Sequence, residues 1–268
     1  MQININDYSF QGKVDNSNSY LTFKPVSPLN NWVQEFWQLN VPEGKYFYRS
    51  VPDNCVDIII NLTFPEEPFI VTPFSSAKVF EMTGPVSYFG IRFRILGHQA
   101  ITQIPLGEWS HVGNVISISD ILPKHLLSAL NDGTYQVMSF QKCCEFSSKI
   151  LLDNLHYCEV DRRLMRYILY CDRRITSNID LSNKQCSEFG VSARHLRRLT
   201  SQYLGLSPRE FAKVFRFQKT LRAMNTEDCT NVWANFYYDQ PHFNRDFKDM
   251  SGVTPNEFRT MSVLYNTE

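Results

Sequence analysis

The sequence predicts an α+β protein, in which a β-rich, barrel-like N-terminal domain precedes an all-α domain. Up to about residue 122, short β-branched or aromatic runs alternate with proline, glycine and asparagine, as in an antiparallel barrel or sandwich. From residue 123 onward, apolar residues recur at helical spacing. Within this second half, the segment from His195 to Phe211 returns 47 positions later, from His242 to Phe258. With 268 residues in the chain, we expect two domains, 1–154 and 155–268.

Four strands and two helices are expected in the N-terminal domain. The strand segments are VDIIINL (56–62), FIVTPF (69–74), YFGIRFRIL (88–96) and VGNVISI (112–118). A helix is expected to begin after Ser27-Pro28, because Leu29, Trp32, Val33 and Phe36 follow at helical spacing. A second helix over 137–151 carries one apolar stripe, which is expected to connect the domains or to join two protomers.

The first half of the repeat predicts a helix-turn-helix motif. NKQCSEFGVS gives a short helix and a turn through Gly190, and Ser192 is a good N-cap for the helix ARHLRRLTSQYL. Gly205 ends that helix. The capping box that Ser207 and Glu210 form around Pro208 then opens a long helix, PREFAKVFRFQKTLRAM.

The second half of the repeat follows the same order of caps and helices. TNVWANFYY is expected to be a short helix, Asp239 begins the next one, Gly252 ends it, and Thr254 to Glu257 repeats the capping box. The long helix between the two units would span roughly 27 Å, and successive major grooves on one face of B-DNA lie about 34 Å apart. Two helix-turn-helix units on one connecting helix are therefore expected to bind double-stranded DNA.

The side chains outside the apolar stripes of the two recognition helices suit base reading. Arginine reads guanine, asparagine and glutamine read adenine, and lysine neutralises phosphate. A solvated basic face is the alternative, but two such faces at this spacing favour DNA. The expected contacts are Arg194, Arg197, Arg198, Ser201 and Gln202 in the first unit and Gln240, His242, Asn244, Arg245 and Lys248 in the second.

Composition and motifs narrow the remaining classes of protein. Residues 1–154 hold 10 basic and 14 acidic side chains, whereas residues 155–268 hold 17 and 13, which favours a polyanion as partner of the second half. No catalytic template such as GxSxG, HExxH or GxxxxGK[ST] occurs, so we expect neither an enzyme nor a cofactor. The seven cysteines have no metal-ligand spacing, and no apolar run would span a membrane. A cytoplasmic protein without a metal site or a membrane partner is expected.

The two helix-turn-helix segments resemble the AraC/XylS family of bacterial transcription regulators. The match covers about 159–260 and rests on GVSxRxLxRLxxxxLGLSPxxF at 190–211 and YDQPHFxRxFKxxxGxTPxEFR at 238–259. It implies a DNA-binding domain of seven helices with two helix-turn-helix motifs. One departure is Phe236, where the family usually has glycine. Phenylalanine there either strains the turn, if φ is positive, or packs in a turn that is adapted to it.

The N-terminal half is similar to the β-rich sensor or dimerisation domain of a subset of that family. On the expected strand IRFRI, Arg92 and Arg94 share one face, where they line a pocket for an anionic ligand or face solvent. The sequence thus predicts a transcription regulator that binds DNA as a homodimer, with a small-molecule effector left open. The alternatives are a barrel-type enzyme or binding protein with a basic docking tail, and an adaptor with weakened DNA binding.

Overall fold

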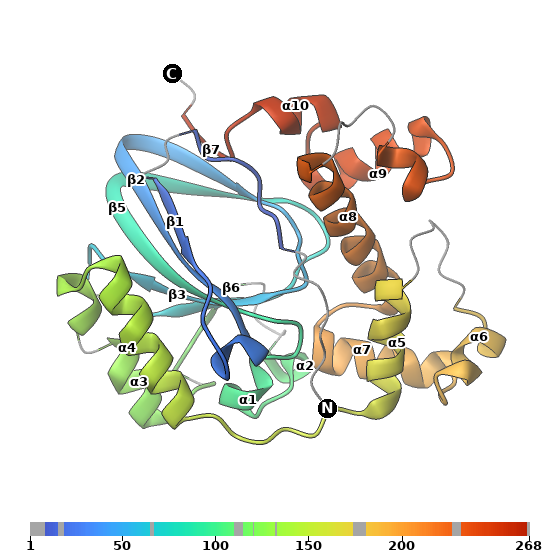
Figure 1. The fold of residues 1–268 in the computed structure, drawn as a ribbon, viewed down its shortest axis with the longest axis horizontal. Helices are drawn as coiled ribbons and strands as arrows, with labels where there is room; N and C mark the ends of the chain where they lie inside the picture. Colours follow the sequence, from blue (N-terminus) through green and yellow to red (C-terminus); the bar gives the residue numbers. More distant parts are fainter. Residues whose placement is uncertain are drawn as a thin grey trace.

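A computed structural model of the chain describes residues 9–15, 19–64, 67–109, 115–119, 121–131, 133–173, 181–226 and 232–266. An antiparallel sheet forms most of the N-terminal half and a set of helices forms the C-terminal half (Figure 1). The α+β class expected from the sequence is confirmed.

The sheet is built on two long antiparallel strands, β2 (Val33–Ser50) and β5 (Lys78–Phe93), which pair along most of their length. The strand order is β1-β2-β5-β3-β4-β6, and β7 also pairs with β2. Gly84 is required where the two long strands approach, because a Cβ there would lie 1.8 Å from the carbonyl oxygen of Pro42. The other strands are β1 (Tyr20–Phe23), β3 (Val56–Asn61), β4 (Phe69–Val71), β6 (Val115–Ser117) and β7 (Leu264–Tyr265).

Helices α3 (Lys124–Asn131) and α4 (Phe140–Asp153) share a core with the sheet (Figure 1). Cys144 and Leu151 of the predicted apolar stripe are buried in that core with Phe36 of β2. The stripe therefore stabilises its own domain, and the expectation that it joins two protomers is wrong. Two short helices, α1 (Gln99–Thr102) and α2 (Leu106–Trp109), follow β5 and were not predicted.

The helix expected after Ser27-Pro28 is also wrong. A single 3-10 turn, η1 (Leu29–Asn31), leads directly into β2. The periodicity of apolar residues did not distinguish a helix from a strand in this segment. Its backbone hydrogen bonds are made with β1 and β5, and β5 lies far along the chain. The four predicted strands correspond to β3, β4, the second half of β5 and β6, although 112–114 lie outside the described residues.

The C-terminal half follows the predicted helix order closely. A second core, rich in aromatic side chains such as Tyr167, Phe211 and Phe247, holds its helices together. The elements are α5 (Arg162–Arg173), α6 (Asn183–Glu188), α7 (Ala193–Leu204), α8 (Pro208–Thr226), the 3-10 helix η4 (Val232–Asn235), α9 (Gln240–Ser251) and α10 (Pro255–Thr260).

The two halves contact each other at several points besides the chain that links them. Strand β7, which follows the last helix, pairs with β2 through Tyr265 and Phe47. On the other side, α2 approaches α7 so closely that a Cβ on Gly107 would lie 2.9 Å from the Cα of Gln202. The amide of Phe10 donates to Gln218 of α8 at 2.8 Å. The N-terminal half therefore holds the helical half at α7, α8 and β7, and the division at residue 154 stays a prediction.

Candidate DNA-binding surface

The first unit consists of α6, a turn and α7, with the caps that the sequence predicts. The Ser192 hydroxyl accepts a hydrogen bond from the amide of His195 at 3.2 Å, which satisfies one free donor at the start of α7. Gly190 in the turn and Gly205 at the end of α7 have φ values of 82° and 69°, which favour glycine. Local sequence therefore sets both the beginning and the end of the first recognition helix.

The second unit consists of η4, a turn and α9. Asp239 caps α9 by accepting from the amide of His242 at 2.7 Å, and Gly252 ends the helix with a φ of 80°. Thr254 and Glu257 form a complete capping box at the start of α10. The connecting helix α8 has 19 residues, or roughly 28 Å at 1.5 Å per residue.

Phe236 does not strain the second turn. Among the described non-glycine residues, positive φ values occur at Asn54, Leu96 and Gln103, and Phe236 is not one of them. Its side chain is 9% exposed and belongs to the core of the helical half. Its amide donates to the carbonyl oxygen of Trp233 at 3.0 Å, which closes the turn after η4. The strained alternative is therefore wrong, and this turn is adapted to an aromatic residue.

Four of the five expected contacts on α7 are exposed. Arg194, Arg197, Arg198 and Ser201 lie on the solvent side, and no described carboxylate pairs with the three arginines. Gln202 is half-buried, because α2 of the N-terminal half packs against its backbone. The N-terminal part of α7 thus offers the basic side chains, whereas its C-terminal end is an internal contact.

Four of the five expected contacts on α9 are also exposed, namely Gln240, Asn244, Arg245 and Lys248. His242 is half-buried, and its ring lies edge-on to Tyr237 with 5.5 Å between ring centroids. The exposed face of α9 therefore combines amide, guanidinium and ammonium groups, which is the mixture that reads adenine, guanine and phosphate.

A buried ion cluster fixes α9 on α8. The carboxylate of Asp246 accepts from Arg216 at 2.7 Å and from Lys213 at 2.9 Å. Burial alone would raise the pKa of Asp246, but the hydrogen bonds from these two cations outweigh it and lower the pKa. The guanidinium of Arg216 also lies 4.9 Å above the ring of Tyr237. This cluster sets the position of the second recognition helix relative to the first.

Two exposed features near these helices were missed by sequence reasoning. Arg166 of α5 is exposed and lies beside the first turn, where its Nη1 is 3.3 Å from the position of a Cβ on Gly190. Tyr238 precedes the cap of α9 and is 86% exposed. The excess of basic residues in the second half was the sequence signal that could have indicated Arg166. For Tyr238, the only signal in the sequence was its position directly before Asp239.

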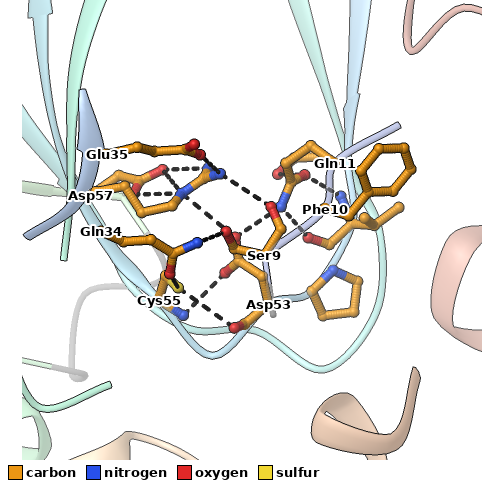
Figure 2. Close-up of polar contacts among 12 residues, drawn as sticks. Ser9, Phe10, Gln11, Gln34, Glu35, Asp53, Cys55 and Asp57 are labelled. Atoms are coloured by element: carbon orange, nitrogen blue, oxygen red, sulfur yellow. Dashed lines mark hydrogen bonds and ion pairs between the residues drawn. The ribbon is translucent and has the colours of Figure 1, made fainter. Parts of the chain in front are cut away.

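The structure places Arg92 and Arg94 differently from the predicted anion pocket. Arg92 is 4% exposed, and its guanidinium contacts three carboxylates, Asp57 at 2.8 Å, Glu35 at 3.2 Å and Asp53 at 3.6 Å (Figure 2). Three acids around one cation leave a local excess of negative charge, which disfavours an anionic ligand. Arg94 donates to the carbonyl oxygen of Asn30 at 2.6 Å. The structure therefore gives no support to an anion site at this pair.

The Arg92 cluster is connected to the helical half. Gln11 donates to Asp53 at 2.8 Å, and the neighbouring Phe10 bonds to Gln218 of α8 (Figure 2). Burial is the largest influence on Asp57 and raises its pKa to about 6, against the opposing effect of Arg92. Asp57 is therefore linked to the helix that carries both recognition units through Arg92, Asp53, Gln11 and Phe10.

The described residues show neither a metal-binding group nor a helix suited to a bilayer. No three His, Cys, Asp or Glu side chains among them are grouped so that they could hold a metal ion. None of the helices in the described part of the chain has the length and apolar character needed to cross a membrane.

Comparison with known proteins gives two family matches within the chain. Residues 185–261 match a helix-turn-helix domain family, and residues 21–113 match a family described as a domain of unknown function (DUF6597). The chain matches none of the curated proteins with which it was compared.

Solved structures that the chain matches include proteins from two bacteria. The C-terminal domain of AraT, a response regulator from Geobacillus stearothermophilus, is 24% identical, with a TM-score of 0.35, over 38% of this chain and 87% of that one. Wild-type ToxT from Vibrio cholerae with bound unsaturated fatty acid is 15% identical, with a TM-score of 0.45, over 93% and 98%. ToxT from Vibrio cholerae O395 is 14% identical, with a TM-score of 0.42, over 92% and 99%.

The match at residues 185–261 contains α7, α8 and α9, with both sets of caps described above. The resemblance expected from the sequence is therefore confirmed where the motifs lie. The chain carries an AraC-type helix-turn-helix domain, a DNA-binding class of domain, behind a β-rich N-terminal half.

Proposed function

We propose that this protein is a sequence-specific transcription regulator that reads promoter DNA with α7 and α9. The observation that supports this most is the pair of exposed, differently composed faces at the two ends of α8. Arg194, Arg197 and Arg198 suit guanine and phosphate in one groove, while Gln240, Asn244 and Arg245 suit a mixed sequence in the next. A protein that only docked on polyanions would not need amide groups on one of the two faces.

The N-terminal domain, residues 1–154, joins two protomers and receives a regulatory signal, while residues 155–268 bind DNA. Two copies would double the phosphate contacts and raise the effective concentration of the second DNA-binding unit, commonly by about 10²–10⁴ in avidity. Because the apolar stripe of α4 lies in its own core, the dimer contact is assigned to the remaining surface of the β-rich half.

Binding of the full chain to a genomic fragment library tests the proposal. Enriched fragments should share a bipartite motif, and their affinity should exceed that of scrambled DNA by roughly 10³-fold or more at a fixed salt concentration of about 150 mM. Equal affinity for enriched and scrambled DNA would leave only a polyanion-binding protein. Sedimentation equilibrium of the full chain tests the dimer separately, and a monomer at micromolar concentration would contradict that part.

A further inference from the structure

A cavity of about 660 Å³ lies where the two halves of the chain meet beside β7. Val14 of the N-terminal segment, Tyr46 and Arg49 of β2, and Met261, Leu264 and Tyr265 of the C-terminal end line it. Its size is within the range of roughly 300–1,000 Å³ that is typical of small-molecule sites. In Figure 1 this region is the edge of the sheet at which β7 lies against β2, next to α10.

Arg49 is the cationic side chain of this cavity and is incompletely satisfied. Its two terminal nitrogens donate over long distances, 3.3 Å to the carbonyl oxygen of Ser251 and 3.4 Å to the hydroxyl of Tyr265. Its Nε is buried and has no hydrogen-bond partner among the described residues. No described carboxylate, including Asp15 in the cavity wall, lies within 4.0 Å of the guanidinium. A half-buried guanidinium without a counter-charge is a binding group for an anion.

The rest of the wall favours an organic molecule over a bare ion. The ring of Tyr265 stacks on Phe47 at 5.8 Å and lies 5.9 Å from the guanidinium of Arg49, so it forms a rigid flat surface. Met261 and Leu264 add apolar area on the side of the C-terminal segment. Asp15 in the same wall disfavours a second negative charge, which argues against polyphosphates.

We propose that this cavity binds a small organic acid with a single negative charge, whose carboxylate pairs with Arg49 and whose apolar body lies against Tyr265, Met261 and Leu264. The site takes the place of the anion pocket that the sequence suggested at Arg92 and Arg94. Its walls come from both halves of the chain, so a bound acid contacts the sheet and the end of the DNA-binding half together. An occupant that prefers one arrangement of the two halves would shift the protein toward it.

This regulatory consequence, though not the binding itself, rests on the proposed function. The amide of Arg49 donates to the carbonyl oxygen of Val263 at 2.8 Å, and its side chain reaches the end of α9 at Ser251. An acid bound to Arg49 therefore contacts the residue that links the sheet to the end of α9.

Calorimetric titration of the full chain with biphenyl-4-carboxylate tests the site, with biphenyl-4-methanol as neutral analogue and inorganic phosphate as competitor. We expect saturable binding of the carboxylate, at least about tenfold weaker binding of the alcohol, and no displacement by phosphate at equal concentration. Arg49→Gln should weaken carboxylate binding at least about tenfold. Lys45→Gln should leave it unchanged, because Lys45 lies on the same strand, is exposed and pairs with Glu81.

Met261→Trp covers the case in which Arg49→Gln does not fold. It keeps the guanidinium but fills the cavity, so it should also abolish binding. The proposal is overturned by binding that Arg49→Gln and Met261→Trp leave unchanged, by equal binding of the alcohol, by displacement with phosphate, or by absence of binding. DNA affinity measured on the same preparations separates the two claims. Intact DNA binding without acid binding rejects the site alone, and acid binding without DNA binding rejects the proposed function alone.

Discussion

The two helix-turn-helix units have matching caps but are held in the molecule by different means. The first recognition helix, α7, ends against α2 of the N-terminal half, where Gly107 lies close to Gln202. The second, α9, is fixed on α8 through the buried carboxylate of Asp246. Both helices pack on the aromatic core, but a close contact with the N-terminal half adds to the packing of α7, whereas buried ion pairs add to that of α9.

The turns of the two units differ in the same way. Gly190 gives the first turn its positive φ, and the position 47 residues later is Tyr237, which is 4% exposed and lies beneath the guanidinium of Arg216. Phe189 and Phe236, which correspond at the same offset, are both buried. The second turn thus replaces a flexible backbone position with aromatic packing. We infer that substitutions will loosen the two units independently, through different contacts.

The largest expected effect comes from the buried aromatic pair that the two turns share. Phe236→Ala and Phe189→Ala should each lower the free energy of unfolding by about 3–5 kcal/mol, because each removes a large side chain from a packed core. Phe236→Gly should cost at least as much as Phe236→Ala and should not tighten DNA binding. Urea denaturation with DNA titration measures both quantities. If Phe236→Gly had the stability of the wild type, or bound DNA more tightly, the interpretation that Phe236 strains the turn would be correct after all.

Asp246→Asn should loosen the second unit selectively, by about 3 kcal/mol at neutral pH. The substitution leaves Arg216 and Lys213 without their shared carboxylate. Because the folded-state pKa of Asp246 is lowered, its contribution is present above the pKa of the unfolded chain and is lost as the pH falls through the folded value. The wild-type and variant unfolding curves should therefore converge in acid. Asp249→Asn is the control, since that carboxylate is 71% exposed and lies 3.8 Å from Lys213.

Local sequence predicted the helical half well because each cap lies within three residues of the amide it satisfies. Ser192, Asp239 and Thr254 all bond as expected. The misplaced helix at Leu29 and the misassigned pair at Arg92 and Arg94 have another origin, since both depend on partners far along the chain. Pairing between β2 and β5 spans tens of residues, and the carboxylates around Arg92 come from other strands and a loop. No window of neighbouring residues contains that information.

Base reading should also differ between the units. Arg197→Ala and Arg245→Ala are each expected to weaken specific binding by about 1–3 kcal/mol and to relax base preference in one half-site only. Lys248→Ala should weaken binding to all sequences and flatten its salt dependence. Competition binding with half-site-scrambled DNA distinguishes these outcomes. An unchanged ratio of specific to scrambled affinity in both arginine variants would show that these side chains do not read bases.

Gly107→Val should disturb the first unit alone, at a cost of about 1–3 kcal/mol in stability. A side chain at this position meets the backbone of Gln202, so α7 and α2 must move apart. We expect weaker recognition of the half-site read by α7, with that of α9 unchanged. Hydrogen exchange of the two helices in the variant measures this directly. Equal loosening of α9 would show that the units are coupled more tightly than their contacts suggest.

The last expected effect is shared by both units, because it arises at the Arg92 cluster, which reaches α8 through Gln11, Phe10 and Gln218. The folded-state pKa of Asp57 is raised from 3.8 to about 6, so the folded protein binds this proton more tightly than the unfolded chain does. Stability from Asp57 is therefore fully present below the unfolded pKa and is lost as the pH rises through about 6, by at most about 1.4 kcal/mol per pH unit.

Asp57→Asn should remove that pH dependence between about pH 4 and 6, whatever it does to stability at a single pH. Glu145→Gln, an exposed acid on α4, should keep it. Denaturation across this range measures the slope, and hydrogen exchange shows where it acts. Because α8 carries both units, amides of α7 and α9 should respond together, unlike in Gly107→Val or Asp246→Asn. A slope that persists in Asp57→Asn would assign the proton to another group, and a response in one unit only would mean that α8 does not transmit it.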